Sequence, residues 1–88
     1  MLVQSTEKAA IPLKKSIYSE KQRKLCDFLK KARIEAGFTQ TDLAKKIGKP
    51  QSFVAKYEGG ERRLDVVELL EVTKLLGLSV KEVMKVVS

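Results

Sequence analysis

The side chains best suited to specific contact chemistry lie between Gln51 and Lys56, directly after Pro50. The amide of Gln51 offers a donor and an acceptor side by side, so it can pair with the edge of an adenine. Lys56 can donate hydrogen bonds to guanine, and the hydroxyl of Ser52 can serve either base. These residue types favour reading of base edges in a nucleic acid. The alternative is that they are solvated polar residues at the start of a helix.

Catalytic chemistry has little support in the sequence. The chain has no histidine, and Cys26 is its one cysteine. These counts exclude a disulfide within the chain, a zinc finger and histidine-based catalysis. No nucleophile stands beside a base, so we expect neither an enzyme nor a bound cofactor. The single thiol suits a reducing cytoplasm, and it fits a core position better than a redox sensor.

Length and composition indicate one small binding domain. The chain has 88 residues, which is too few for two separate hydrophobic cores. Hydrophobic residues make up 43% and charged residues 33% of the chain, as is typical of a soluble globular protein. No apolar run approaches the roughly 18 residues of a membrane span, and no apolar signal segment follows Met1. We therefore expect a cytoplasmic protein that does not contact a membrane.

The charge is unevenly distributed along the chain. The net charge is +7, and residues 1–37 hold nine bases and four acids. Residues 64–88 hold three bases and four acids. A basic first and middle section beside a neutral end indicates a surface that faces an anionic polymer. A charged face that is merely solvated is the alternative.

Capping residues and glycines predict the elements that must position these side chains. The expected fold is all-α, a compact five-helix bundle over residues 19–88, preceded by an extended, partly ordered arm over residues 1–18. Few alternating β-branched runs occur, so strands are not expected. The predicted helices run from about Ser19 to Ala36, from Thr39 to Gly48, from near Pro50 to Gly59, from Asp65 to Gly77, and from Ser79 onward.

Apolar spacing predicts which face of each helix is buried. Leu25, Leu29 and Ala32 form a stripe on the first helix, because they recur at helical spacing. Residues 66–76 carry apolar side chains around much of their circumference, which predicts that the fourth helix is the central and most buried one. The inward residues expected of the second and third helices are Leu43, Ala44, Ile47, Val54 and Tyr57.

The second and third predicted helices have the features of a helix-turn-helix. Gly48 allows the sharp turn, and Ala44 is small where the helices must touch. In the segments QTDLAKKIG (40–48) and PQSFVAKYEGG (50–60), the chain resembles the XRE family of helix-turn-helix regulators, to which the lambdoid phage repressors and Cro belong. The resemblance extends from about Leu25 to Met84 and implies a five-helix bundle. Lys49 departs from the pattern, because the family often has an apolar residue there.

The resemblance implies a role for each matched residue of the helix-turn-helix. Gln40 matches a glutamine that binds phosphate and braces the recognition helix. Gln51, Ser52 and Lys56 match base-facing positions, although Lys56 could equally contact phosphate. Phe53 matches a position near the sugar-phosphate wall, with packing against the arm as the alternative.

Four further residues complete the candidate site. In some phage repressors, the positions that Arg33 and Glu58 match form a buried ion pair between the first and third helices. Arg62 and Arg63 follow the recognition helix directly. Their charge and position favour contacts with phosphates, and solvation of a loop is the alternative.

These features predict a sequence-specific regulator of transcription that binds double-stranded DNA and acts as a repressor by occupancy. A second reading is the antitoxin of a toxin–antitoxin pair, with a toxin as protein partner. A third is a protein-interaction module that has lost DNA binding. The polar residues Gln51, Ser52 and Lys56 favour the first reading over the third.

A homodimer is the expected assembly, because one domain presents only one recognition helix. Two such helices about 34 Å apart could enter successive major grooves of a pseudo-palindrome. The last helix carries a stripe of Val80, Val83, Met84 and Val87. Val83 is expected to cover its own domain in part. Met84 and Val87, with Val80, are the candidates for the two-fold contact.

Overall fold

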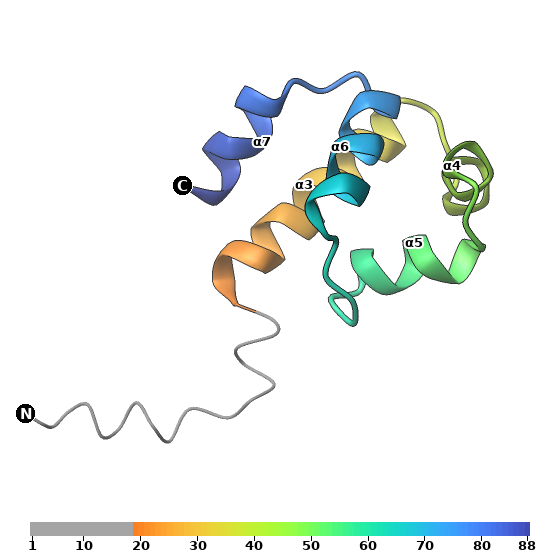
Figure 1. Ribbon diagram of the computed structural model, residues 1–88, viewed down its shortest axis with the longest axis horizontal. Helices are drawn as coiled ribbons and strands as arrows, with labels where there is room; N and C mark the ends of the chain where they lie inside the picture. The colour runs from red at the N-terminus through yellow and green to blue at the C-terminus, as the bar shows by residue number, and fades with distance from the viewer. Residues whose placement is uncertain (1–18) are drawn as a thin grey trace, which may run out of the picture.

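The computed structural model describes residues 19–88, and the predicted arm over residues 1–18 lies outside the described residues. Within the described part, the chain forms five helices and no strand, as expected from the sequence (Figure 1). The all-α prediction is therefore confirmed. The helices are α3 (Glu20–Glu35), α4 (Gln40–Ile47), α5 (Gln51–Glu58), α6 (Val66–Leu75) and α7 (Val80–Val87).

Local capping interactions set the helix boundaries where the sequence predicted them. The Thr39 hydroxyl accepts a hydrogen bond from the backbone N–H of Asp42, and the Asp42 carboxylate accepts one from the N–H of Thr39, at 3.0 and 2.9 Å. Such reciprocal bonds satisfy backbone donors that a helix start otherwise leaves unpaired. Gly48 ends α4 at a φ of +70°, a conformation that favours glycine. The same reciprocal pattern begins α6 and α7, at Asp65 with Glu68 and at Ser79 with Glu82.

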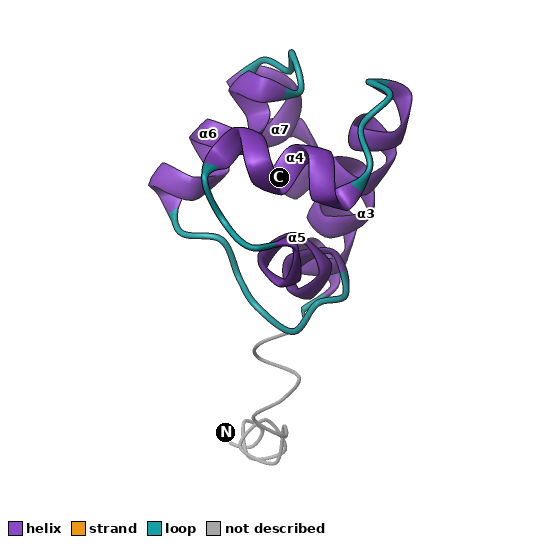
Figure 2. Cartoon of the chain, turned by 90° about the vertical axis from the view of Figure 1, so that its right-hand side faces the viewer, coloured by secondary structure: helices purple, strands orange, loops and turns teal. Residues whose placement is uncertain are grey.

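The core forms where α3 contacts α5 and α7, and where α4 contacts α5 and α6 (Figure 2). The predicted inward residues of α3 lie in it, and Leu29 is fully buried. Tyr57 of α5 is the largest of the fully buried side chains. Packing of α5 on α3 and α4 orients its exposed face. Other buried members of the core are Leu25, Ala32, Leu43, Ala44, Phe53, Val54, Val72, Leu76 and Val83.

The prediction that the fourth helix is the most buried one is wrong. On α6, Val66 is 71% exposed and Val67 is 65% exposed, and Leu70 is also exposed. Only Val72 and Thr73 of this helix are buried. In a domain of this size, α6 packs along one stripe against α4 and α7, so apolar side chains outside that stripe remain at the surface.

A buried ion pair joins the first described helix to α5. The Nε atom of Arg33 lies 2.6 Å from Oε2 of Glu58, and its Nη2 atom donates to Oε1 at 3.1 Å. The Arg33 side chain is 9% exposed and the Glu58 side chain 3%. Arg33 also donates from Nη1 to the carbonyl oxygen of Phe38 at 2.7 Å, which holds the connection that leads into α4. One guanidinium thus links α3, the connection that follows it, and α5.

We expect Glu58→Ala to destabilise the domain by about 3–5 kcal/mol, because it leaves the buried guanidinium of Arg33 without its carboxylate. Urea unfolding followed by circular dichroism measures this loss. Glu20→Ala is the matched control, because Glu20 forms an exposed ion pair with Arg23, and surface pairs contribute about 0–1 kcal/mol. Equal unfolding midpoints for the two variants would contradict a stabilising role of the buried pair.

Candidate nucleic-acid interface

The helix-turn-helix consists of α4 and α5, which pack directly on one another. It lies at the opposite side of the molecule from α7 (Figure 1). Gln51 and Ser52 are the first residues of α5, and both are exposed together with Lys56 one turn later. The helix begins at Gln51, with Pro50 at the capping position before it. The three predicted base-reading residues therefore share an accessible surface of one short helix.

A relay of hydrogen bonds connects the buried ion pair to this surface. The Glu58 carboxylate, which can only accept when ionised, receives a hydrogen bond from Nε2 of Gln40 at 2.9 Å. With its Nε2 directed at Glu58, the Gln40 amide directs its Oε1 toward Gln51. Nε2 of Gln51 donates a hydrogen bond to this Oε1 at 2.8 Å. Gln51 keeps its own Oε1 and one N–H for another partner. The relay presents an acceptor and a donor in a fixed orientation at the start of α5.

Phe53 does not lie at an exposed wall, contrary to the sequence-based expectation. It is 7% exposed and belongs to the core. Its ring meets that of Tyr57, with centroids 5.6 Å apart in an edge-to-face arrangement. Because the two residues are four positions apart on α5, they share its inward face. Phe53 therefore packs within the domain, where little of its side chain is accessible to a DNA backbone.

Phe53 and three charged residues near its ring form what we term the Phe53–Glu68 cluster: Lys49, Phe53, Arg62 and Glu68. The Arg62 guanidinium lies 4.7 Å from the ring centroid of Phe53, and Lys49 Nζ lies 5.3 Å from it. Arg62 also binds both carboxylate oxygens of Glu68, at 2.9 and 3.0 Å. Lys49 Nζ is 3.8 Å from the same carboxylate. The cluster joins the turn, α5 and the start of α6.

The cluster changes the interpretation of two residues. The sequence predicts that Arg62 binds phosphate, but its guanidinium forms a bidentate ion pair with Glu68, which anchors the loop after α5. Lys49 stands where the resemblance to the XRE family leads us to expect an apolar residue, and its ammonium lies over the ring of Phe53. The sequence pattern did not indicate that Glu68 belongs to the site, because Lys49 and Arg62 approach it from 19 and six positions away.

Other basic residues surround the helix-turn-helix. Lys45 and Lys46 lie in the last turn of α4 and are exposed. Lys46 Nζ lies 5.3 Å from the ring centroid of Phe38, which holds its stem along the surface. Arg63 is exposed in the loop after α5. Positive charge therefore borders the polar face of α5 on the side of the turn and on the side of the following loop.

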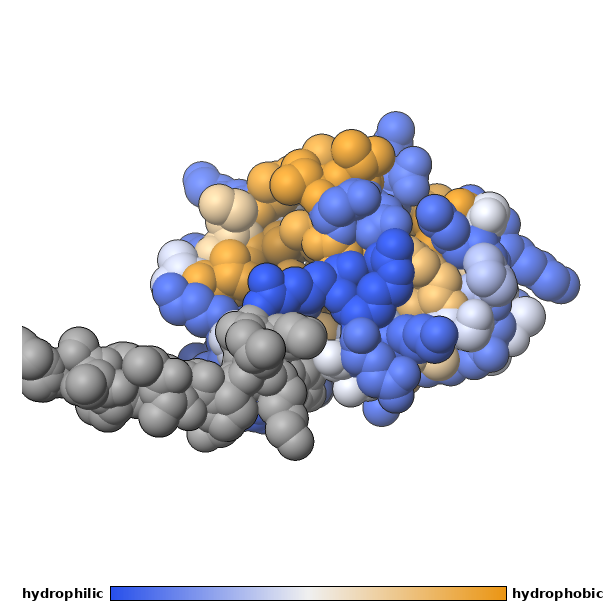
Figure 3. All heavy atoms as spheres, turned by 60° about the horizontal axis from the view of Figure 1, so that its bottom comes forward, coloured by the Kyte–Doolittle hydropathy of each residue, from blue (hydrophilic) through white to orange (hydrophobic). Residues whose placement is uncertain are grey.

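The residues predicted for the two-fold contact divide between core and surface. Val80 is 52% exposed and Met84 is 58% exposed. Val87 instead packs partly buried against the core, which leaves less of its side chain exposed than those of Val80 and Met84. In Figure 3, apolar side chains gather in one broad area of the surface, bordered by hydrophilic ones. Val80 and Met84 line a groove of about 170 Å³ together with Val66, Leu69, Leu70, Thr73 and Val83.

Reactive groups are few in the described residues. Cys26 is 2% exposed, and burial raises the pKa of its thiol, so the protonated form is favoured. Residues 19–88 contain no group of three or more metal-ligating side chains. None of their helices combines the length and the apolar character needed to cross a membrane.

The Phe53–Glu68 cluster predicts a dependence of stability on pH. Hydrogen bonds from Arg62 and from the backbone N–H of Asp65 lower the pKa of Glu68 from 4.5 to about 2. A carboxylate with a lowered folded-state pKa stabilises the fold above its unfolded-state pKa, and this stability is lost as the pH falls toward the folded-state value. We expect Glu68→Gln to lower the melting temperature at pH 7, and the difference from wild type to shrink between about pH 4.5 and pH 2.

Thermal unfolding monitored by circular dichroism across this pH range tests the prediction. Glu71→Gln is the matched control, because Glu71 is exposed one turn later on the same helix. A difference between Glu68→Gln and wild type that stays constant from neutral to acid pH would contradict the proposed ionised state.

Comparisons with known proteins agree with this geometry. The family described as Helix-turn-helix matches residues 29–83, whereas no curated protein matches the chain. Among solved structures, an XRE-family like protein from Pseudomonas syringae pv. tomato str. DC3000 is 41% identical, with a TM-score of 0.72 over 81% of this chain and 87% of that chain. A point mutant of the restriction-modification controller protein C.Esp1396I is 30% identical, with a TM-score of 0.70 over 78% and 87% of the two chains. From its sequence, its fold and these similarities, the chain belongs to the XRE family of helix-turn-helix transcriptional regulators, which bind DNA.

Proposed function

We propose that the protein is a sequence-specific repressor that inserts α5 into the major groove of double-stranded DNA. The observation that carries this proposal is the hydrogen-bond relay from Glu58 through Gln40 to Gln51. A side chain held in one orientation loses little conformational freedom when it binds, so it can discriminate between bases. The proposed domain comprises residues 19–88, with residues 1–18 as a separate arm, and it acts in the cytoplasm by occupying its operator.

Contacts to bases and to the DNA backbone are assigned to different residues. Gln51 and Ser52 at the start of α5, with Lys56 further along, read base edges. Gln40 contacts a phosphate near the start of α4 while it braces Gln51. Arg63 contacts a phosphate on the other side of α5. Backbone contacts of this kind add affinity and set the position of the helix without carrying sequence information.

The functional unit of the proposal is a homodimer that contacts itself through α6 and α7. Exposed apolar side chains from both helices, Val66, Leu70, Val80 and Met84, border one groove. A second copy that buries this surface would remove it from water and present two copies of α5 to a pseudo-palindromic operator. The surface is small, so the dimer should be weak and strengthened by DNA.

One observation favours a more specific role within this function. The similarity at 30% identity is to a restriction-modification controller. Control of a restriction–modification operon is therefore the second candidate. No comparable observation supports the antitoxin reading or the loss of DNA binding.

We expect Gln51→Ala to weaken operator binding and to relax sequence preference at one base pair of each half-site. A good two-bond contact contributes roughly 1–3 kcal/mol of discrimination. Gln40→Ala should produce part of the same relaxation, because it leaves Gln51 without its brace. Selection from a random oligonucleotide library, followed by sequencing of the bound pool, measures both effects.

Lys81→Ala is the matched control for this selection, because Lys81 is exposed on α7, away from the helix-turn-helix. It should select the wild-type motif. A Gln51→Ala protein that selects the unchanged motif would remove Gln51 from the base-reading set.

Self-association is tested with Val80→Asp/Met84→Asp. We expect this variant to be monomeric in sedimentation at concentrations where the wild type dimerises, because it places carboxylates in an apolar contact. Lys81→Gln/Lys85→Gln changes the net charge by the same amount at exposed positions of α7, and it should dimerise normally. A wild type that binds its operator as a monomer would refute the dimer.

A further inference from the structure

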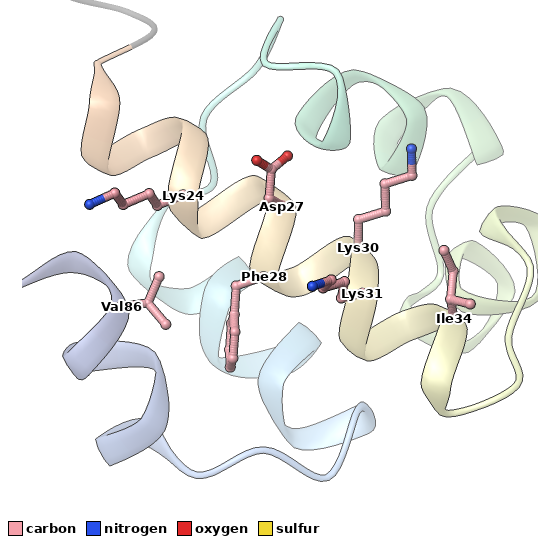
Figure 4. A pocket seen from close by; sticks show the side chains of 7 residues that line it. All are labelled: Lys24, Asp27, Phe28, Lys30, Lys31, Ile34 and Val86. Carbon is pink, nitrogen blue, oxygen red and sulfur yellow. The ribbon is translucent and has the colours of Figure 1, made fainter.

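We propose that a groove between α3 and α7 binds an acidic amphipathic segment of a partner protein. The groove has a volume of about 650 Å³ and lies outside the helix-turn-helix. Six of its lining residues come from α3, and Val86 comes from α7 (Figure 4). This proposal goes beyond DNA binding and does not depend on it.

The floor of the groove is apolar. The ring of Phe28 is directed into the space between α3 and α7, with Val86 across from it (Figure 4). Phe28 is only partly buried, although it packs against the core. Ile34, at the far end of the lining on α3, is 56% exposed, and its side chain is directed away from Phe28 (Figure 4). A partner that covers these side chains would remove apolar surface from water, which favours binding.

The rim of the groove is basic. The lining includes Lys24, Lys30 and Lys31 and the single carboxylate of Asp27. Lys24 and Lys31 lie on the side of Phe28 and Val86, whereas Lys30 and Asp27 project from the opposite side of α3 (Figure 4). Within residues 19–88, none of these lysines forms an ion pair, whereas Asp27 lies 3.8 Å from the guanidinium of Arg23. The positive charge of the rim is thus not neutralised by the described part of the chain. It suits carboxylates placed on either side of an apolar stripe.

The charge of the groove argues against three other possible occupants: the chain's own first residues, a second copy of the chain, and DNA. Residues 1–18 carry three lysines and one glutamate, and the whole chain has a net charge of +7. The chain's own first residues and a second copy would therefore bring further positive charge to the rim. DNA would supply negative charge but no apolar group for Phe28 and Ile34. An acidic segment with an apolar stripe satisfies both the rim and the floor.

The test uses a fluorescein-labelled amphipathic peptide with Leu and Phe at helical spacing and Glu at the other positions. Fluorescence anisotropy should show saturable binding to the full chain that weakens as salt is added. Two control peptides, one with Lys in place of Glu and one with Ala in place of Leu and Phe, should bind at least about tenfold more weakly. Amide shifts in the NMR spectrum should map to residues 24–34 and Val86.

Variants separate the groove from the overall charge of the protein. Lys24→Glu/Lys31→Glu reverses two rim charges and should reduce peptide affinity by about tenfold or more. Lys81→Glu/Lys85→Glu changes the net charge equally at exposed positions that do not line the groove, and it should bind within about twofold of wild type. Ile34→Ser, an exposed site that does not threaten folding, should also weaken binding.

Each of these outcomes would overturn the proposal: equal binding of the glutamate and lysine peptides, shifts that map to α4 and α5, or equal loss of affinity in the rim variant and the control variant. The rim variant should keep its affinity for operator DNA. If it lost DNA affinity instead, the three lysines would belong to the DNA-binding surface, and the groove proposal would fail while the repressor proposal stood.

Discussion

The buried carboxylate of Glu58 is the constraint on which the arrangement of the helix-turn-helix depends. A charge removed from water must be paired and hydrogen-bonded, and Glu58 meets this need with Arg33 of α3 and Gln40 of α4. Three helices are therefore tied to one side chain at the end of α5. Because the carboxylate accepts only, it also determines the orientation of the Gln40 amide and through it the orientation of Gln51. An electrostatic requirement of the core is in this way transmitted to the exposed surface.

The Phe53–Glu68 cluster holds the other side of α5. Its two cations contact the ring of Phe53 and share the carboxylate that caps α6. Helix α5 is thus attached to α3 and α4 through Glu58, and to the turn and to α6 through Phe53. This attachment uses Phe53 and Arg62, two residues whose types alone suggest contacts with DNA. In so small a domain, the side chains that hold α5 in position are engaged within the protein and are less available for contacts with a partner.

The remaining surface divides into faces of different chemistry because so small a domain cannot bury all its apolar residues. On α6 and α7, aliphatic side chains remain exposed around one groove. On α3, lysines surround Phe28 and Ile34 beside α7. The exposed face of α5 is polar at Gln51, Ser52 and Lys56. The proposals above assign a different partner to each face: a second copy, an acidic protein segment and the edges of bases.

The sequence by itself determined the helices and their ends, because caps such as Thr39 with Asp42 and the glycine at Gly48 act over at most four residues. It also placed Arg33, Glu58, Gln40 and Gln51 in a known pattern, so their grouping could be anticipated. The tertiary structure alone decided that Phe53 faces inward, that Arg62 pairs with Glu68, and that α6 leaves much of its apolar surface exposed. These outcomes depend on which side of each helix meets its neighbours. The apolar residues of α6 surround the helix, so their pattern does not define one buried face, and packing between distant segments makes that choice.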